Sequence, residues 1–194
     1  PAEFHAQTAV EAAIKLHESV ASKLEIIDKI VIRTQEPAIR IISKVGKLAN
    51  AADRDHCIQY MVAVGLIFGD LIAEYYEDDF HQENQLIDKL RDKMIIEEDN
   101  QFSMDYLDPE KRSIANAVQV FFNDGTCSDD IQIEYPIGHK KRREEGIPLL
   151  EEKFWNNLNT CFDKDKSKLI YDLCLDQEKL EKTKVHEFME LFVK

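Results

Sequence analysis

The spacing of apolar residues predicts several helices in the first two thirds of the chain. Apolar residues recur every three or four positions between residues 8 and 20, which is typical of an amphipathic helix. From residue 53 to about residue 76 they fall on nearly all sides, so we expect a helix buried between two layers. A shorter amphipathic pattern covers residues 83–94. These segments are the helices expected in this part of the chain.

Short runs of β-branched residues between these helices predict strands. Ile30-Val31-Ile32 and residues 94–97 are the first candidates. Pro37 interrupts the first run, because proline cannot donate a hydrogen bond to a neighbouring strand. Residues 39–42 either continue this strand or form a second short one.

A hairpin is the clearest strand signal. Residues 114–122 alternate between apolar and polar positions, Asn123-Asp124-Gly125 supplies a turn, and residues 131–135 alternate again. Each of the two strands has one apolar face, so we expect a layer of helices to cover it. The first part of the chain is therefore predicted to be α+β, with a small antiparallel, hairpin-containing sheet in a two-layer arrangement.

The pattern changes at a junction between Pro136 and Pro148. The strand pattern stops at Pro136, a loop bounded by glycines carries a run of basic residues, and Pro148 is expected to open a helix. The remaining apolar stripes are purely helical, at residues 149–162, 167–174, 177–182 and 184–193. We therefore predict two parts with separate cores, an α+β unit over residues 1–137 and an all-helical segment over residues 138–194.

Composition and charge narrow the classes of function. The chain has 194 residues, 44% of them hydrophobic, and a formal net charge of −13. This charge argues against general binding to nucleic acids or anionic membranes, because the summed field repels phosphate. The four cysteines are far apart, which favours reduced thiols and gives no sign of an iron–sulfur or other metal site. Because the chain begins with Pro1 and not Met, we expect it to be a piece of a longer protein.

Four stretches carry polar groups that could serve a site. They are residues 1–8, Arg33-Thr34-Gln35-Glu36 with Arg40, Asp53-Arg54-Asp55-His56, and residues 139–143. Each has an ordinary structural explanation: a capped helix start, a solvated strand face, a structural ion pair and a solvated basic loop. Considered one at a time, none of them identifies a reaction.

Taken in order, however, the stretches resemble one family. Residues 1–13, 32–36, 53–63 and 134–154 are similar, in the same order, to the C-terminal portion of the dehydratase branch of the iron–sulfur-independent MmgE/PrpD family. The resemblance covers essentially the whole chain but less than half of a family member. It implies a two-domain enzyme in which residues 1–137 form a lid. Residues 138–194 would return into a large helical domain whose main part lies outside this chain.

The resemblance also implies an activity, with alternatives. The expected reaction is the elimination of water from 2-methylcitrate to give 2-methyl-cis-aconitate in propionate catabolism, without a metal or other cofactor. A sister decarboxylase or isomerase acting on similar acids is one alternative, and a non-catalytic acidic interaction module is another. The expected partners are a small tricarboxylate and a second copy of the full-length enzyme. The expected location is the cytoplasm, or the mitochondrial matrix in a eukaryote.

Dehydration of a tertiary alcohol flanked by carboxylates requires proton transfer and cations that neutralise the carboxylates. On this basis the chain offers three candidate catalytic histidines: His5, His56 and His139. It also offers four candidate substrate-binding residues: Gln7, Arg40, Arg54 and Arg142. Gln7 replaces a histidine found in some relatives, so its role is left open. We expect separated cations to converge where the two parts meet, with much of the proton chemistry supplied from outside this chain.

Overall fold

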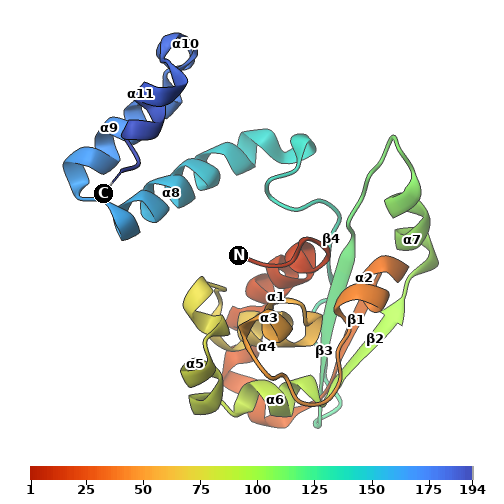
Figure 1. Cartoon of the computed structure of the whole chain (residues 1–194). Helices are drawn as coiled ribbons and strands as arrows, with labels where there is room; N and C mark the ends of the chain where they lie inside the picture. The colour runs from red at the N-terminus through yellow and green to blue at the C-terminus, as the bar shows by residue number, and fades with distance from the viewer. Residues whose placement is uncertain (194) are drawn as a thin grey trace. The chain divides into compact units, whose positions relative to one another are not determined.

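The computed structural model describes residues 1–193 and divides the chain into two compact units, with the boundary between Pro136 and Ile137 (Figure 1). The helices of the first unit are η1 (Phe4–Ala6), α1 (Gln7–Val20), η2 (Ala21–Ile26), α2 (Glu36–Ile42), α3 (Ala51–Asp55), α4 (Ile58–Phe68), η3 (Ala73–Tyr76), α5 (Asp78–Glu83), α6 (Leu86–Arg91) and α7 (Asn100–Leu107). Its strands are β1 (Ile27–Thr34), β2 (Met94–Glu98), β3 (Asn116–Phe122) and β4 (Ile131–Ile133).

The sheet is mixed and has the strand order β2-β1-β3-β4. Strands β3 and β4 form the predicted antiparallel hairpin, and β3 also runs antiparallel to β1. Strand β2 lies parallel to β1, with Ile30 opposite Met94. The α+β class is thus confirmed, but the sheet is not purely antiparallel because the chain between β1 and β2 crosses over through helices.

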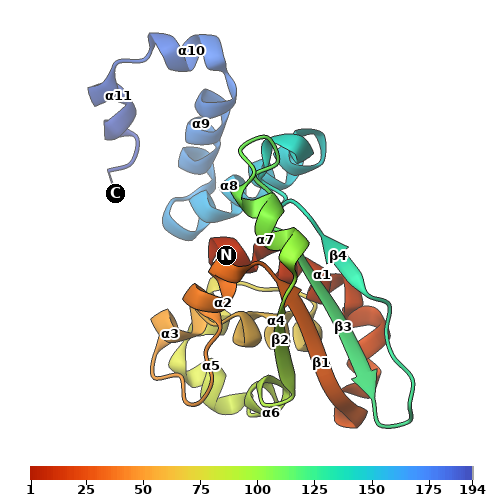
Figure 2. The ribbon, with the colours of Figure 1, turned by 90° about the vertical axis from the view of Figure 1, so that its right-hand side faces the viewer.

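One face of the sheet is covered by helices, as Figures 1 and 2 show together. Helix α1 packs against β3 and β4, and α4 packs against α1, so α4 is buried on all sides over residues 58–66. This matches the expectation of a helix enclosed between layers. The core of the unit consequently runs from α4 through α1 to the inner face of the sheet.

Two predicted elements of this unit are wrong, one in its type and the other in its continuity. Residues 39–42 belong to helix α2 and not to a strand, because Pro37 fits the first helical turn, where its missing N–H is not needed. The single helix predicted from residue 53 to about 76 is divided. His56 and Cys57 leave the helical conformation between α3 and α4, and Gly69 ends α4 with φ of 68°, a backbone conformation that favours glycine.

The predicted helix at residues 83–94 is also shorter than expected. Helix α5 ends at Glu83, and α6 covers only Leu86–Arg91. Helix α7 was not predicted at all, because its sequence has no clear apolar stripe. Its start is nevertheless marked by Asp99, whose carboxylate accepts hydrogen bonds from the backbone N–H groups of Gln101 and Phe102.

Every regular element in the described part of the second unit is a helix, as predicted. Its helices are η4 (Lys140–Arg142), α8 (Arg143–Cys161), α9 (Lys164–Leu175), α10 (Gln177–Lys182) and α11 (Val185–Glu190). Pro148 does not open a helix, since α8 already begins at Arg143, with Glu144 and Glu145 in the first turn where negative charge is favoured. The expected basic loop is therefore a short 3-10 turn leading directly into α8. Within residues 1–193, no helix is both long and apolar enough to cross a lipid bilayer.

Candidate functional site

His5 lies in a small polar cluster at the start of α1. It is 8% exposed, and its ring contacts two polar side chains. Nδ1 lies 2.8 Å from a carboxylate oxygen of Glu3, and Nε2 lies 3.3 Å from the hydroxyl of Tyr106, in α7. Because a carboxylate only accepts hydrogen bonds, Nδ1 is the donor and carries the proton. In a neutral His5 the lone pair therefore lies on Nε2, which accepts from Tyr106.

The backbone around His5 is held by strand β3. The buried side-chain amide of Asn116 donates to the carbonyl of His5 at 2.8 Å and to the hydroxyl of Thr8 at 2.7 Å. Thr8 in turn donates to the carbonyl of Ile114 at 2.6 Å. His5 is therefore fixed both through its ring and through its main chain, which is the condition for a side chain that must transfer a proton in one geometry.

Two buried amides near this cluster retain an unsatisfied polar atom. Among residues 1–193, Oδ1 of Asn116 and Nε2 of Gln35 have no hydrogen-bond partner. Gln35 directly follows Thr34, which pairs with Asn116 across β1 and β3. Such orphaned groups are uncommon in a folded interior, and they make this end of the sheet one of the polar regions of the core.

Arg54 is the most deeply buried of the predicted cations, at 2% exposed. Its Nε donates to the carbonyl of Tyr76 at 2.6 Å, and its guanidinium also contacts Asp78 and, at 3.4 Å, Nδ1 of His81. The hydroxyl of Tyr76 donates to the carbonyl of Pro1 at 2.7 Å, and burial raises the pKa of this tyrosine. Arg54 therefore joins α3 to α5 and, through Tyr76, to the first residue of the chain.

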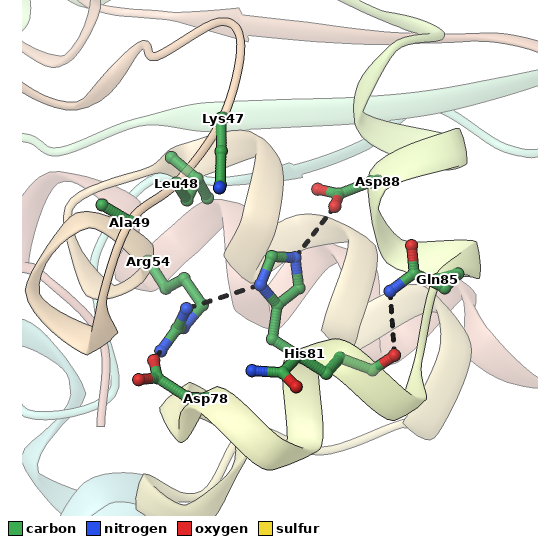
Figure 3. Close-up of a pocket in the computed structure, with 9 residues that line it drawn as sticks. Lys47, Leu48, Ala49, Arg54, Asp78, His81, Gln85 and Asp88 are labelled. Carbon is green, nitrogen blue, oxygen red and sulfur yellow. Dashed lines mark hydrogen bonds and ion pairs between the residues drawn. The ribbon is translucent and has the colours of Figure 1, made fainter.

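A cavity of about 420 Å³ opens beside Arg54 (Figure 3). It is lined by Lys47, Leu48, Ala49, Arg54, Asp78, His81, Gln82, Gln85 and Asp88. The ring of His81 lies between a cationic and an anionic side chain. Its Nδ1 faces the guanidinium of Arg54, and its Nε2 lies 2.9 Å from a carboxylate oxygen of Asp88. The volume suits a small molecule. The guanidinium, however, already has a carboxylate partner within the cavity wall, so its charge is largely offset before any ligand binds.

The other predicted residues of the first unit lie elsewhere. His56 is exposed, and its Nδ1 lies 2.5 Å from a carboxylate oxygen of Asp55. Arg40 is 77% exposed along its side chain and pairs with Glu36 one helical turn earlier. The amide of Gln7 donates to the carbonyl of Ala2 at 3.3 Å. Arg54 alone among the seven predicted site residues lines the described cavity.

His139 and Arg142 belong to the second unit. The ring of His139 accepts a hydrogen bond from the backbone N–H of Lys141 at 3.2 Å, at the start of η4. Arg142 forms an ion pair with Glu145 at 2.8 Å. The convergence of these two residues with those of the first unit stays a prediction.

Sequence reasoning missed several residues that complete these clusters. Glu3, Tyr106 and Asn116 surround His5, while Asp78 and His81 surround Arg54. Glu3 could have been noticed, because it precedes His5 by two residues at a helix start. The remaining contacts join residues more than 20 positions apart, and no local sequence pattern predicts them. Within residues 1–193, no group of three or more His, Cys, Asp or Glu side chains is arranged to hold a metal ion.

Comparison with known proteins decides the family. A family model described as the MmgE/PrpD C-terminal domain matches residues 1–177. The chain belongs to the MmgE/PrpD family. Among its MmgE/PrpD relatives, a curated protein of Salmonella typhimurium named 2-methylcitrate dehydratase is 52% identical over the whole chain and 40% of its own length.

Eukaryotic relatives carry similar names. A probable 2-methylcitrate dehydratase of Saccharomyces cerevisiae is 51% identical over 99% of this chain and 38% of its own length. A protein of Yarrowia lipolytica named 2-methylcitrate dehydratase, mitochondrial, is 47% identical over the whole chain and 37% of its own length. This MmgE/PrpD chain thus spans about 40% of the length of the curated relatives it matches.

Proposed function

We propose that this chain forms the lid and C-terminal helical segment of a 2-methylcitrate dehydratase, which eliminates water from 2-methylcitrate to give 2-methyl-cis-aconitate. The observation that carries the proposal is identity of 52% along the whole chain with a protein of that name. The domain model, described for the C-terminal part of the family, supports the same assignment. The lid corresponds to residues 1–137 and the helical segment to residues 138–194.

The reaction sets three chemical requirements. A base must take a proton from carbon, an acid must protonate the departing hydroxyl, and cations must neutralise the carboxylates and the charge that develops beside them. We assign proton transfer to His5, His56 and His139, and substrate binding to Gln7, Arg40, Arg54 and Arg142. His5 has the strongest support, because both of its ring nitrogens have defined partners.

We further propose that the enzyme acts as a homodimer on a small tricarboxylate. Its location would be the cytoplasm, or the mitochondrial matrix in a eukaryotic cell; the name of the Yarrowia relative describes that protein as mitochondrial. Light scattering coupled to size-exclusion chromatography of the complete protein tests the dimer. A mass equal to one chain at micromolar concentration would remove that part of the proposal.

The deciding experiment compares substrates. The protein expressed from its complete reading frame is supplied separately with 2-methylcitrate, citrate and cis-aconitate, and the absorbance of the conjugated product and carbon dioxide release are followed. We expect kcat/KM to be highest for 2-methylcitrate, with no carbon dioxide. Preferential decarboxylation of cis-aconitate would indicate a sister enzyme. Absence of turnover on all three acids would contradict the dehydratase assignment.

A further inference from the structure

We propose that Glu3 and Tyr106 are positioning residues of His5, and that the three side chains form one carboxylate–imidazole–phenol relay with its proton-transferring nitrogen at Nε2. The inference deepens the proposed function and rests on it for the identity of the reaction. The arrangement itself depends only on the geometry of the first unit.

Glu3 holds His5 in two ways. One carboxylate oxygen lies 2.8 Å from Nδ1 of the ring, and the other accepts the backbone N–H of His5, also at 2.8 Å. The side chain of Glu3 is 13% exposed and that of His5 is 10% exposed, so water competes weakly for these hydrogen bonds. The carboxylate therefore selects the tautomer with hydrogen on Nδ1 and would stabilise the ring when it carries a second proton.

Tyr106 fixes the other end of the ring. Its hydroxyl lies 3.3 Å from Nε2, and the two rings are tilted at 36° with their centroids 5.7 Å apart. At 3.3 Å the hydrogen bond is long enough to be exchanged for a shorter bond to a ligand hydroxyl. Tyr106 thus keeps Nε2 oriented and hydrogen-bonded in the free protein, and with substrate bound its hydroxyl stays beside Nε2 and orients the group that exchanges a proton with the ring.

The proton balance of the elimination is simple. One C–H bond and the C–O bond of the hydroxyl break, the C–H electron pair becomes the second bond between the carbons, and water leaves. His5 contributes by accepting or returning one proton at Nε2, while Glu3 remains ionised beside Nδ1 throughout. Neither Glu3 nor Tyr106 forms a covalent bond with the substrate.

The first arm of the test measures the tautomer directly. Two-bond ¹⁵N–¹H correlation spectra of ¹⁵N-histidine-labelled chain report which ring nitrogen of His5 is protonated. We expect the Nδ1–H form in the wild type and in Tyr106→Phe, and its loss in Glu3→Ala. An Nε2–H form in the wild type would overturn the relay, whether or not the enzyme is active.

The second arm measures catalysis of 2-methylcitrate dehydration by the complete protein. We expect Glu3→Gln and Tyr106→Phe each to lower kcat by on the order of tenfold, with KM changed by less than about twofold, because positioning acts on the transition state. Tyr75→Phe is the matched control. This substitution also removes a tyrosine hydroxyl, but at a position outside the relay, and it keeps the ring that stacks on Phe80. The kcat of Tyr75→Phe should therefore stay within about twofold of the wild-type value.

The two arms separate the possible failures. Unchanged kcat in both variants, or an effect confined to KM, would overturn the positioning role even if the tautomer is as expected. A wild-type protein without dehydratase activity would contradict the proposed function, and the tautomer would then still decide whether the relay exists.

Discussion

The two units of the chain differ in how far their own residues bury one another. In the first unit a continuous core includes Ile30, Ile32 and Met61, all fully buried. In the second, the buried residues of its two longest helices, as described, are few: Gly146, Leu158, Ser167, Ile170 and Leu173. Large apolar side chains such as Leu149 and Leu169 are about half exposed there.

This difference matters for the site. His5 and Arg54 are held by hydrogen bonds to distant parts of a well-packed unit, so their positions follow from the fold of that unit. In the second unit, the ring of His139 accepts a hydrogen bond from Lys141, and Arg142 pairs with Glu145. We infer that the fold of the first unit is sufficient to position the polar clusters around His5 and Arg54. The helical unit, in contrast, requires further apolar contacts to reach comparable stability.

The largest effect should come from the core of the first unit. Ile32→Ala removes a side chain that is fully buried in β1, which costs about 2–5 kcal/mol of unfolding free energy. Leu169→Ala, at a position 53% exposed in α9, should cost less than about 1 kcal/mol. Urea unfolding followed by circular dichroism measures both. Equal losses would contradict the proposed contrast between the units.

The next effect separates two arginines that sequence reasoning treated alike. Arg54→Met leaves the carbonyl of Tyr76 without its donor and should destabilise the protein by about 2–4 kcal/mol. Arg40→Met removes only an exposed pair with Glu36 and should change stability by less than about 0.5 kcal/mol. Thermal unfolding of the two variants side by side tests this. A similar melting temperature for both would show that Arg54 does not support the fold.

The sequence allowed the α+β class, the hairpin and the helical tail to be predicted, because each depends on a local period of apolar residues. The prediction from sequence failed where a local pattern was compatible with two structures, or where burial depended on distant residues. Three of residues 39–42 are β-branched isoleucines, yet the position of Pro37 in the first turn makes this stretch helical. Arg54 could be named from sequence, but its burial could not, since this depends on Tyr76 and Asp78 more than 20 residues away.

A third effect concerns the close approach that defines the start of the second unit. A Cβ atom at Gly146 would lie 2.1 Å from the carbonyl oxygen of Ile137, whereas one at Gly138 would meet nothing within 4 Å. Gly146→Ala should therefore destabilise this unit by about 1–3 kcal/mol, despite alanine's better helix propensity. Gly138→Ala is the control and should be nearly neutral. Hydrogen exchange of α8 reports both, and faster exchange confined to Gly138→Ala would contradict the contact.

The smallest effect is the pH-dependent stabilisation by an ion pair between Asp105, in α7, and Lys111, which follows this helix. A hydrogen bond from Lys111, at 2.7 Å, lowers the pKa of Asp105 and raises the pKa of Lys111. Unfolded aspartate and lysine titrate near about 3.9 and 10.4. The pair therefore stabilises the fold between these values, and the contribution is lost as pH falls through the folded pKa of Asp105 or rises through that of Lys111.

Asp105→Asn should accordingly lower the melting temperature at pH 7 by less than Gly146→Ala does. The difference from wild type should shrink as the pH falls through the folded pKa of Asp105, which lies below its ordinary value, because both proteins then lack the charge. Melting curves from pH 2.5 to 7 measure this. A difference that stays constant across the range would show that the ion pair is not its source.

The most direct test of the account is the kinetic effect of His5 in the complete protein acting on 2-methylcitrate. If the first unit holds this histidine as a proton-transfer group, His5→Gln should lower kcat/KM by about 10²–10⁴-fold, while the melting temperature stays close to that of the wild type. A kcat/KM within threefold of the wild type, in a protein that is folded and active, would contradict it.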